Sequence, residues 1–428
     1  MKGALHCLRL LIFSVLFLTA CERTIETRPE EDIMPTALTL KVEEVGDSII
    51  ISWQADKGKF EYFKLSWNWQ TETSSMQHYE FLLDGHVNRH ALKFTAPIPF
   101  NSFRVAGYLK SGTEILSNLQ EIKHPELLPI QFSAFDALID SKQLYLFDIT
   151  GKVLIYNVDK YEVIKNQAVG GGRIGYCDFG VFNNQKELYV PGVNGSLYIY
   201  NAADLELIDQ INVGYPLHSV AYSNGLLFVS TDRDFNNPLK VYSRRDKNLI
   251  TAQGFYGTGR LKVVPGTNTQ LVEITNATTP AIATFYVFDA DGTFVTKKQD
   301  TYHGTYNKSG GLFYMYPDGS RFVSSGSGTI FNKTMNIEHV LSTVADRNIY
   351  LSFCVSNEAN ILYAGKYREK RVELFAATGY SFQKSVETPY FPRWLFRVNN
   401  KTLVVGSIYA PPFWSDQLSK FYLTYLDE

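Results

Sequence analysis

Two short stretches of this chain carry residue types and spacings that could do chemistry. Gly170–Gly175 reads GGGRIG and matches the glycine spacing of a dinucleotide-binding loop, which needs a strand before it and a helix after it. A strand-like run follows instead, so we predict a connecting loop. Asp289–Gly292 has the opening of a calcium loop but lacks the bidentate glutamate in the expected register, so we predict a hairpin turn.

Other patterns of catalysis are absent from the sequence. The 8 histidines never fall at metal-ligand spacing with one another or with a cysteine, and no Gly-x-Ser-x-Gly elbow occurs. We therefore predict no metal, no cofactor and no catalytic residue. The enzyme class stays open, because a fold built from repeats can gather catalytic groups from separate units.

Basic residues recur just before apolar, strand-like runs, at intervals of roughly 45 residues or a multiple of that length. The recurring residues are Arg173, His218, Arg260, Arg347 and Arg393, with Tyr306 or Lys308 at the matching place in one further unit. If the runs are repeats of one fold, these residues surround one opening. An arginine presents a planar fork of donors that suits carboxylate or sulfate.

A stiff aromatic segment lies near the C-terminal end, between two predicted strands. Its sequence is Tyr409-Ala410-Pro411-Pro412-Phe413-Trp414, and Tyr367 and Arg368 occupy the corresponding loop one repeat earlier. Aromatic side chains held by prolines lose little entropy when they stack on a ligand. We predict that Tyr367, Arg368, Tyr409 and Trp414 bind a ligand together with the recurring basic residues. The alternative is that the aromatic residues cover a sheet edge and the arginines bond to neighbouring carbonyls.

The N-terminus has the pattern of an export signal. Lys2 and Arg9 precede the apolar run Leu10–Leu18, which covers roughly 14 Å as a helix and is too short to span a bilayer. Leu18-Thr19-Ala20-Cys21 resembles the lipobox of bacterial lipoproteins. This resemblance implies removal of residues 1–20, lipidation of Cys21 and attachment to a bacterial cell-envelope membrane, with the outer membrane favoured. Whether the protein faces the surface or the periplasm stays open, and simple secretion is the alternative.

Composition limits the partners of the chain. It has 428 residues, of which 45% are hydrophobic, and this length predicts two or more domains. Loss of Lys2 and Arg9 with the leader leaves 39 basic against 43 acidic residues, which argues against general nucleic-acid binding. Only Cys177 and Cys354 remain as thiols, both in apolar runs, so we expect two free cysteines and no disulfide framework.

The first folded part is predicted over residues 37–124, after a charged tether at 21–36. Seven short strand-like runs fill it, as in a β-sandwich. The runs Ile51–Trp53, Tyr62–Trp67 and Phe103–Gly112 resemble strands B, C and F of a fibronectin type III domain, with Phe103 where that family often has tyrosine. In the alternating run Ile49, Ile51 and Trp53, the three side chains share one face, so we expect Trp53 in the core.

Two prolines, Pro125 and Pro129, break the strand pattern and mark a predicted domain boundary. Beyond it, over residues 128–428, an apolar pair recurs seven times at spacings between 39 and 51 residues. The pairs are Leu144-Tyr145, Leu188-Tyr189, Leu227-Phe228, Leu271-Val272, Phe322-Val323, Leu362-Tyr363 and Leu403-Val404. Units of this length with four short strands predict an all-β propeller. Val213–Gly225 resembles the repeat of YVTN-type bacterial propellers.

Seven apolar pairs predict seven blades, although six or eight stay open because of the longest spacing. The last unit offers about three strands, so we expect Leu128–Phe132 to supply its fourth strand and close the ring. The favoured function is noncatalytic binding of a glycan, preferably acidic, or of a partner protein. The alternatives are a propeller enzyme that acts on polysaccharide and a scaffold subunit of an envelope complex. The oligomeric state is not predicted.

Overall fold

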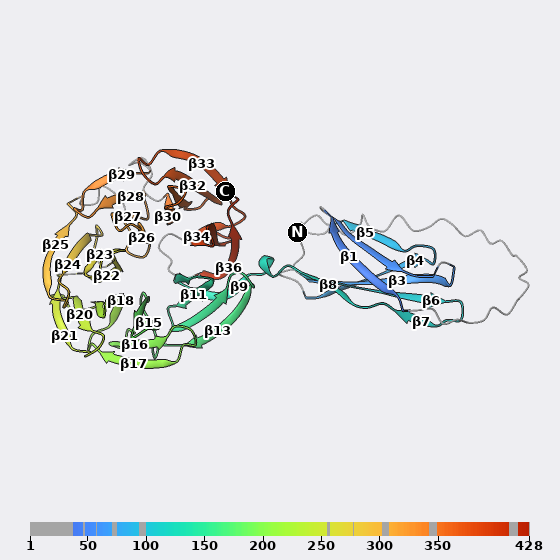
Figure 1. Ribbon diagram of the computed structural model, residues 1–428, viewed down its shortest axis with the longest axis horizontal. Coiled ribbons are helices and arrows are strands. Elements are labelled where there is room, and N and C mark those ends of the chain that lie inside the picture. The colour runs from blue at the N-terminus through green and yellow to red at the C-terminus, as the bar shows by residue number, and fades with distance from the viewer. Residues whose placement is uncertain are drawn as a thin grey trace, which may run out of the picture.

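The computed structural model of this protein is built almost entirely of β-strands. It describes residues 37–45, 48–56, 58–70, 75–93, 100–254, 257–276, 278–301, 308–341, 349–410 and 418–427. Figure 1 shows two parts, a small group of strands from the first part of the chain and a ring of sheets. No helix within the described ranges is long and apolar enough to cross a membrane.

The first part contains two antiparallel sheets around one apolar core. One sheet has the order β1-β2-β5, and the other has the order β4-β3-β6-β7 with β8 paired to β6. The strands are β1 (Thr39–Val45), β2 (Ser48–Gln54), β3 (Phe60–Gln70), β4 (Gln77–Asp84), β5 (Arg89–Lys93), β6 (Phe100–Leu109), β7 (Glu114–Leu116) and β8 (Gln120–Lys123).

Trp53 lies in the core between these two sheets, as its alternating run predicts. Ile49, Ile51 and Trp53 are the buried positions of β2, and the rings of Trp53 and Phe63 meet edge to face with centroids 5.3 Å apart. The core also takes Leu65 from β3 and Val105 from β6. Membership in the fibronectin type III family stays a prediction.

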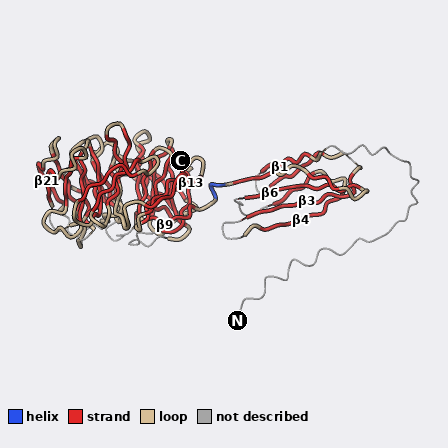
Figure 2. Tube along the Cα trace, turned by 90° about the horizontal axis from the view of Figure 1, so that it is seen from below, coloured by secondary structure: helices blue, strands red, loops and turns tan. Residues whose placement is uncertain are grey.

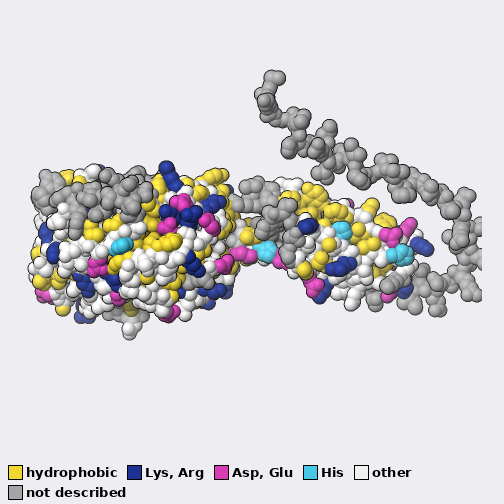
Figure 3. Space-filling view, turned by 90° about the horizontal axis from the view of Figure 1, so that it is seen from above, with side chains coloured by type: hydrophobic (Ala, Val, Ile, Leu, Met, Phe, Trp, Pro, Cys, Tyr) yellow, Lys and Arg dark blue, Asp and Glu magenta, His cyan; other side chains and the backbone are white. Residues whose placement is uncertain are grey.

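A short 3-10 helix, η1 (Pro125–Leu127), connects the two parts. His124, just before it, has Nε2 2.9 Å from Oε1 of Glu44 and Nδ1 3.0 Å from Oε1 of Glu126. Burial opposes the charged imidazole, but the hydrogen bonds to the two carboxylates outweigh it and raise the pKa of His124. Figure 3 shows histidine and acidic side chains at this narrow connection. The independence of the two parts as folding units stays a prediction.

The second part is a ring of seven four-stranded antiparallel sheets, so it is a β-propeller (Figures 1 and 2). Blade 1 consists of β10 (Asp136–Asp140), β11 (Gln143–Asp148), β12 (Lys152–Asn157) and β13 (Glu162–Ala168). Blade 2 consists of β14 (Asp178–Phe182), β15 (Gln185–Pro191), β16 (Ser196–Asn201) and β17 (Leu207–Asn212). Blade 3 consists of β18 (Leu217–Ser223), β19 (Leu226–Thr231), β20 (Leu239–Ser243) and β21 (Leu249–Gln253).

Blades 4 to 7 continue around the same centre. Blade 4 consists of β22 (Gly259–Val263), β23 (Gln270–Thr275), β24 (Ala283–Phe288) and β25 (Phe294–Gln299), and blade 5 of β26 (Phe313–Met315), β27 (Arg321–Ser324), β28 (Thr329–Asn332) and β29 (Ile337–Val340). Blade 6 consists of β30 (Tyr350–Ser356), β31 (Ile361–Lys366), β32 (Arg371–Ala376) and β33 (Phe382–Glu387). Blade 7 consists of β34 (Phe391–Val398), β35 (Lys401–Ser407), β36 (Leu418–Tyr425) and β9 (Ile130–Ala134).

The seven apolar pairs of the sequence all lie on the second strand of a blade, and their side chains are buried. This strand has a neighbouring strand on each side and a neighbouring blade against each face. Both of its faces are therefore covered, which explains why it reads as a continuous apolar run. The blade count of seven is confirmed.

The ring closes with a strand from the start of the propeller, as predicted. In blade 7 the order is β34-β35-β36-β9, and Ile130 pairs with Phe421 while Gln131 pairs with Lys420. Ile130 and Phe132 pack in one buried cluster with Trp394 and Phe421 of blade 7 and with residues of blade 1. The cluster thus joins the first and last blades.

If this cluster holds the ring closed, Phe132→Ala should lower the free energy of unfolding of the propeller by about 3 to 5 kcal/mol, because it removes a buried aromatic ring. The matched control is Gln131→Ala, whose side chain on the same strand is exposed and should change stability by less than about 0.5 kcal/mol. Urea unfolding of both variants measures the difference. Equal stability of the two variants would show that the closing strand contributes little.

Candidate functional site at the mouth of the propeller

The topology of the blades brings two sets of loops to one face of the ring. One set leads from the outermost strand of a blade into the innermost strand of the next, and the other joins the second and third strands. We call this the mouth face. A hydrogen bond from the Val193 amide to the Arg173 carbonyl, 2.9 Å long, joins one loop of each kind. Rigid sheets that display loops are a common basis for binding sites.

Arg260 lies across the channel and not on its rim. Its Nη2 is 2.8 Å from each carboxylate oxygen of Asp136, which belongs to blade 1, whereas Arg260 belongs to blade 4. Nη1 donates to the carbonyl of Gly311, just before blade 5, and the guanidinium carbon lies 4.3 Å from the ring centroid of Tyr176. Arg260 is thus held by residues of several blades. We call Arg260, Asp136, Tyr176 and the Gly311 carbonyl the channel lock.

His218 packs beside the channel lock, with its ring 5.4 Å from that of Tyr176. Its Nε2 is 2.8 Å from Nδ2 of Asn276, so the imidazole accepts a hydrogen bond from the amide. Loss of hydration lowers the pKa of His218 to about 4, and nearby Arg260 acts in the same direction. The residue is therefore neutral near pH 7 and adds no positive charge to the mouth.

The predicted ring of open cations is wrong at Arg260 and Arg393. Both side chains are buried, and the guanidinium of Arg393 lies 5.4 Å from the ring centroid of Trp394. Arg260 is the second residue of its innermost strand and Arg393 the third, and both side chains are covered by neighbouring residues of the ring. Lys308, a candidate for the fifth unit, is also buried and forms an ion pair with Asp300 at 3.1 Å.

The remaining predicted residues occupy loops of the mouth face. Arg173 and Arg368 are exposed, Tyr367 is half-buried, and the guanidinium carbon of Arg368 lies 5.0 Å from the ring centroid of Tyr367. Tyr409 is 77% exposed, at the end of the second strand of blade 7. A ligand-binding role for these residues stays a prediction. Cys21, Tyr306, Arg347, Phe413 and Trp414 lie outside the described residues.

Sequence reasoning missed a surface on blades 2 and 3. We call it the blade 2–3 patch, and its exposed side chains are Arg173, Val193, Tyr215, Arg233 and Phe235. Its loops are adjacent, since the Asp232 amide donates to the Pro216 carbonyl at 2.7 Å. An apolar residue within a polar turn, such as Phe235 in Asp234-Phe235-Asn236, is the signal that could have revealed it.

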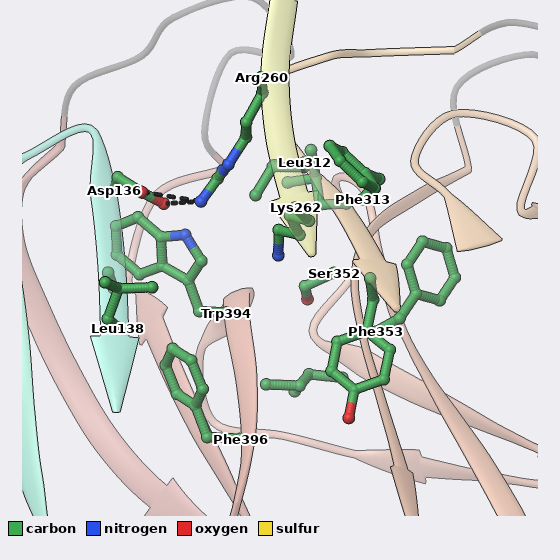
Figure 4. Close-up of a pocket in the computed structure, with 14 residues that line it drawn as sticks. Asp136, Leu138, Arg260, Lys262, Leu312, Phe313, Ser352, Phe353, Trp394 and Phe396 are labelled. Carbon is green, nitrogen blue, oxygen red and sulfur yellow. Dashed lines mark hydrogen bonds and ion pairs between the residues drawn. The ribbon is translucent and has the colours of Figure 1, made fainter. Parts of the chain in front are cut away.

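A cavity of about 120 Å³ lies in the channel, lined by residues of five innermost strands. Its residues include Lys262, Ser352, Trp394 and Phe396, together with Asp136 and Arg260 of the channel lock (Figure 4). Loss of hydration, and then the charge of Arg260, lowers the pKa of Lys262 to about 7. The sequence analysis did not single out Lys262, Ser352 or Trp394.

The two motif-like stretches are turns. Gly170–Gly172 has positive φ at each residue and lies between β13 and β14, so a strand follows and not a helix. Asp289–Gly292 joins β24 to β25, and Oδ1 of Asp289 accepts a hydrogen bond from the Thr293 amide at 2.7 Å. Cys177 and Cys354 are both buried, and neither forms a disulfide within the described residues. Within the described ranges, no group of three or more histidine, cysteine, aspartate or glutamate side chains could hold a metal ion.

Comparison with solved structures shows the class of fold. The chain resembles the β-propeller domain of Cps50 (Swd1) from Myceliophteria thermophila, with a TM-score of 0.50 and 10% sequence identity over 69% of this chain and 98% of that domain. At this identity the likeness shows the fold alone. No family model matches the chain, and no curated protein matches its sequence.

The channel lock makes a prediction about stability. Arg260→Met should cost about 3 to 5 kcal/mol in the free energy of unfolding, because it leaves the Asp136 carboxylate buried without a partner. The double variant Arg260→Met with Asp136→Leu should lose much less, since neither charge remains. Urea unfolding of the two single variants and the double variant completes the cycle. Additive losses would mean that the two side chains are not coupled.

Proposed function

We propose that this chain is a lipid-anchored protein of the bacterial cell envelope that binds a partner protein through the mouth face of its propeller. A β-propeller fold supports a binding or scaffold role in general. The observation that carries the proposal is the blade 2–3 patch, where exposed aromatic and aliphatic side chains stand beside arginines. Aromatic residues and arginine are the residue types enriched at protein interfaces.

The contacts beneath the patch keep its loops in place. The ammonium of Lys240 lies 4.9 Å from the ring centroid of Tyr215 and 2.7 Å from a carboxylate oxygen of Asp234. Asp234 precedes Phe235, which is 62% exposed. Tyr215 and Phe235 lie on loops that these contacts hold in place, so they lose little conformational entropy when a partner binds. This favours their use as aromatic anchors in a protein interface.

An acidic glycan is the second candidate ligand. Arg173, Arg368, Tyr367 and Tyr409 support it, because cations and aromatic rings on one face suit an anionic sugar. The burial of Arg260 and Arg393 leaves fewer open cations than the sequence predicts, and Val193 and Phe235 offer a sugar no hydrogen bond. The patch therefore favours a protein partner.

The scaffold alternative has support on the outer strands. Exposed apolar side chains recur at the start of the outermost strand in several blades, and Figure 3 shows apolar and charged side chains side by side on the rim of the ring. These residues are Val163, Ile164, Leu207, Ile208, Leu249, Val295 and Phe382. They are spread over five blades, so among the described residues they form separate spots. The compact blade 2–3 patch is the stronger candidate.

The proposed anchor rests on the lipobox-like sequence that ends at Cys21. The charged segment 21–36 would act as a tether, and the fibronectin-like part, residues 37–124, as a spacer between the membrane and the propeller. The outer membrane is the proposed location. This arrangement would hold the mouth face at a distance from the bilayer where a partner can reach it.

If Cys21 carries the lipid, Cys21→Ser should abolish incorporation of a fatty-acid analogue and partitioning into the membrane fraction, because the thiol that takes the lipid is lost. Cys7→Ser is the matched control, since Cys7 lies in the predicted leader and should leave both unchanged. Metabolic labelling followed by membrane fractionation measures the effect. Persistent labelling of the Cys21→Ser protein would contradict the anchor.

If the blade 2–3 patch binds a partner, a photo-crosslinking amino acid at Phe235 should yield one discrete crosslinked product in cells, and Arg173→Ala should reduce its yield. Val181 is the matched control position, because it is 59% exposed and lies at the opposite end of blade 2. A product of equal yield from both positions, or none from Phe235, would contradict the proposal. A glycan array on the purified protein separates the alternatives, since salt-sensitive binding of acidic glycans would assign the mouth face to a glycan.

A further inference from the structure

The channel cavity carries a second inference, independent of the mouth face. We propose that it is a binding site for a small monocarboxylate, whose carboxylate would be held by Lys262, Ser352 and Trp394 and whose short apolar tail would rest against the aromatic walls. The three side chains come from three blades, because they lie on β22, β30 and β34. Only the closed ring brings them together.

Lys262 is a cation in the channel without a protein anion of its own. Within the described residues its ammonium has no hydrogen bond or ion pair, and its contact is the ring of Phe313, 5.3 Å from the centroid. The carboxylates nearby are already engaged, since Asp136 binds Arg260 through both oxygens and Asp178 accepts the Tyr222 amide at 2.9 Å. A charge with so little water around it is costly unless an opposite charge comes close.

Two further donors lack an acceptor. Trp394 Nε1 and Ser352 Oγ are buried polar atoms with no hydrogen-bond partner among the described residues, and the two residues are only 4% and 5% exposed. An indole N–H can only donate, and a hydroxyl can turn its proton toward an oxygen. Buried polar groups are almost always hydrogen-bonded in native proteins, so these two atoms point to an acceptor that the chain itself does not supply.

The arrangement of the side chains fits an anionic head with an apolar tail. Lys262, Ser352 and Trp394 all line the cavity, and Figure 4 draws the Lys262 ammonium, the Ser352 hydroxyl and the indole ring around it. Leu138, Phe353 and Phe396 line the rest of the space. A cavity of about 120 Å³ has room for a small organic ion. One unpaired cation matches a single negative charge, and apolar walls disfavour a phosphate dianion.

The charge of Lys262 makes binding depend on pH. Its pKa of about 7 means that the empty site loses its cation as the pH rises through neutrality. The charges that act on it are those of Arg260 on its own strand, Asp136 on β10 and Asp178 on β14. Tyr314 on β26 lines the same cavity, and His218 on β18 packs beside the channel lock. Asp178 has a pKa raised to about 6 by loss of hydration, and His218 stays neutral above about pH 4. Affinity for a carboxylate should therefore fall between about pH 6 and pH 8.

Isothermal titration calorimetry of the full chain with sodium propionate tests the proposal. We expect saturable binding at one site, which Lys262→Met weakens by about tenfold or more because a charge-assisted hydrogen bond is lost. Trp394→Phe and Ser352→Ala each remove one donor and should weaken binding severalfold. Lys298→Met is the matched control, since Lys298 is exposed on β25 of the same blade and should leave affinity unchanged.

The same titrations contain the results that would overturn the site. Propionate that fails to bind, or that binds Lys262→Met as tightly as the unaltered chain, rules the proposal out. Chloride or inorganic phosphate that binds as tightly as propionate rules out a carboxylate site. If Lys262 causes the pH dependence of affinity, Lys262→Met should remove that dependence and Asp178→Asn should keep it. Loss of the dependence in Asp178→Asn and its persistence in Lys262→Met would contradict the role of Lys262. Thermal unfolding confirms that each variant is folded.

Discussion

The constraint on which this structure depends is that no blade can bury its own faces. A four-stranded sheet covers the backbone of its second and third strands, but the side chains above and below need a neighbouring sheet. In the ring each blade packs against the blade before it and the blade after it, and so covers one face of each. The two ends of the chain must therefore meet, and β9 beside β36 completes the last blade with the first strand of the propeller. Without that pairing, two blade faces and one sheet edge would be open to water.

Closure of the ring also decides where charges can lie. The innermost strands converge on a narrow channel, so a long side chain at the start of such a strand is turned toward the other blades. Arg260 finds Asp136 there, 124 positions away in the chain, and the pair satisfies both charges. Arg244 likewise binds Glu187 of the preceding blade at 2.8 Å. Ion pairs between blades thus fix contacts that apolar packing alone leaves adjustable.

The channel and the mouth face have different physical characters. At the mouth face, loops from neighbouring blades present exposed aromatic and arginine side chains around a rigid base, which suits contact with a large partner. In the channel, Lys262, Ser352 and Trp394 line a small cavity together with apolar side chains. A cavity of about 120 Å³ has no room for a macromolecule, so it suits a small ion. The two sites can therefore be studied separately.

The sequence alone predicted the repeat, the closing strand and seven blades, with six or eight left open, because each depends on local periodicity. The second strand of a blade, such as the one that holds Leu188-Tyr189, is apolar on both faces in each repeat. The last repeat has one strand too few, so another segment of the chain must supply its fourth strand. Loop assignments for Gly170–Gly175 and Asp289–Gly292 followed from the residues on either side. Tertiary structure alone decided which side chains face the channel. Arg173 lies in the loop before β14 and is exposed, whereas Arg260 is the second residue of β22 and is buried against the Asp136 carboxylate. The direction of a side chain within a ring depends on partners from distant blades. The spacing of residues along the sequence does not show which distant residues these are.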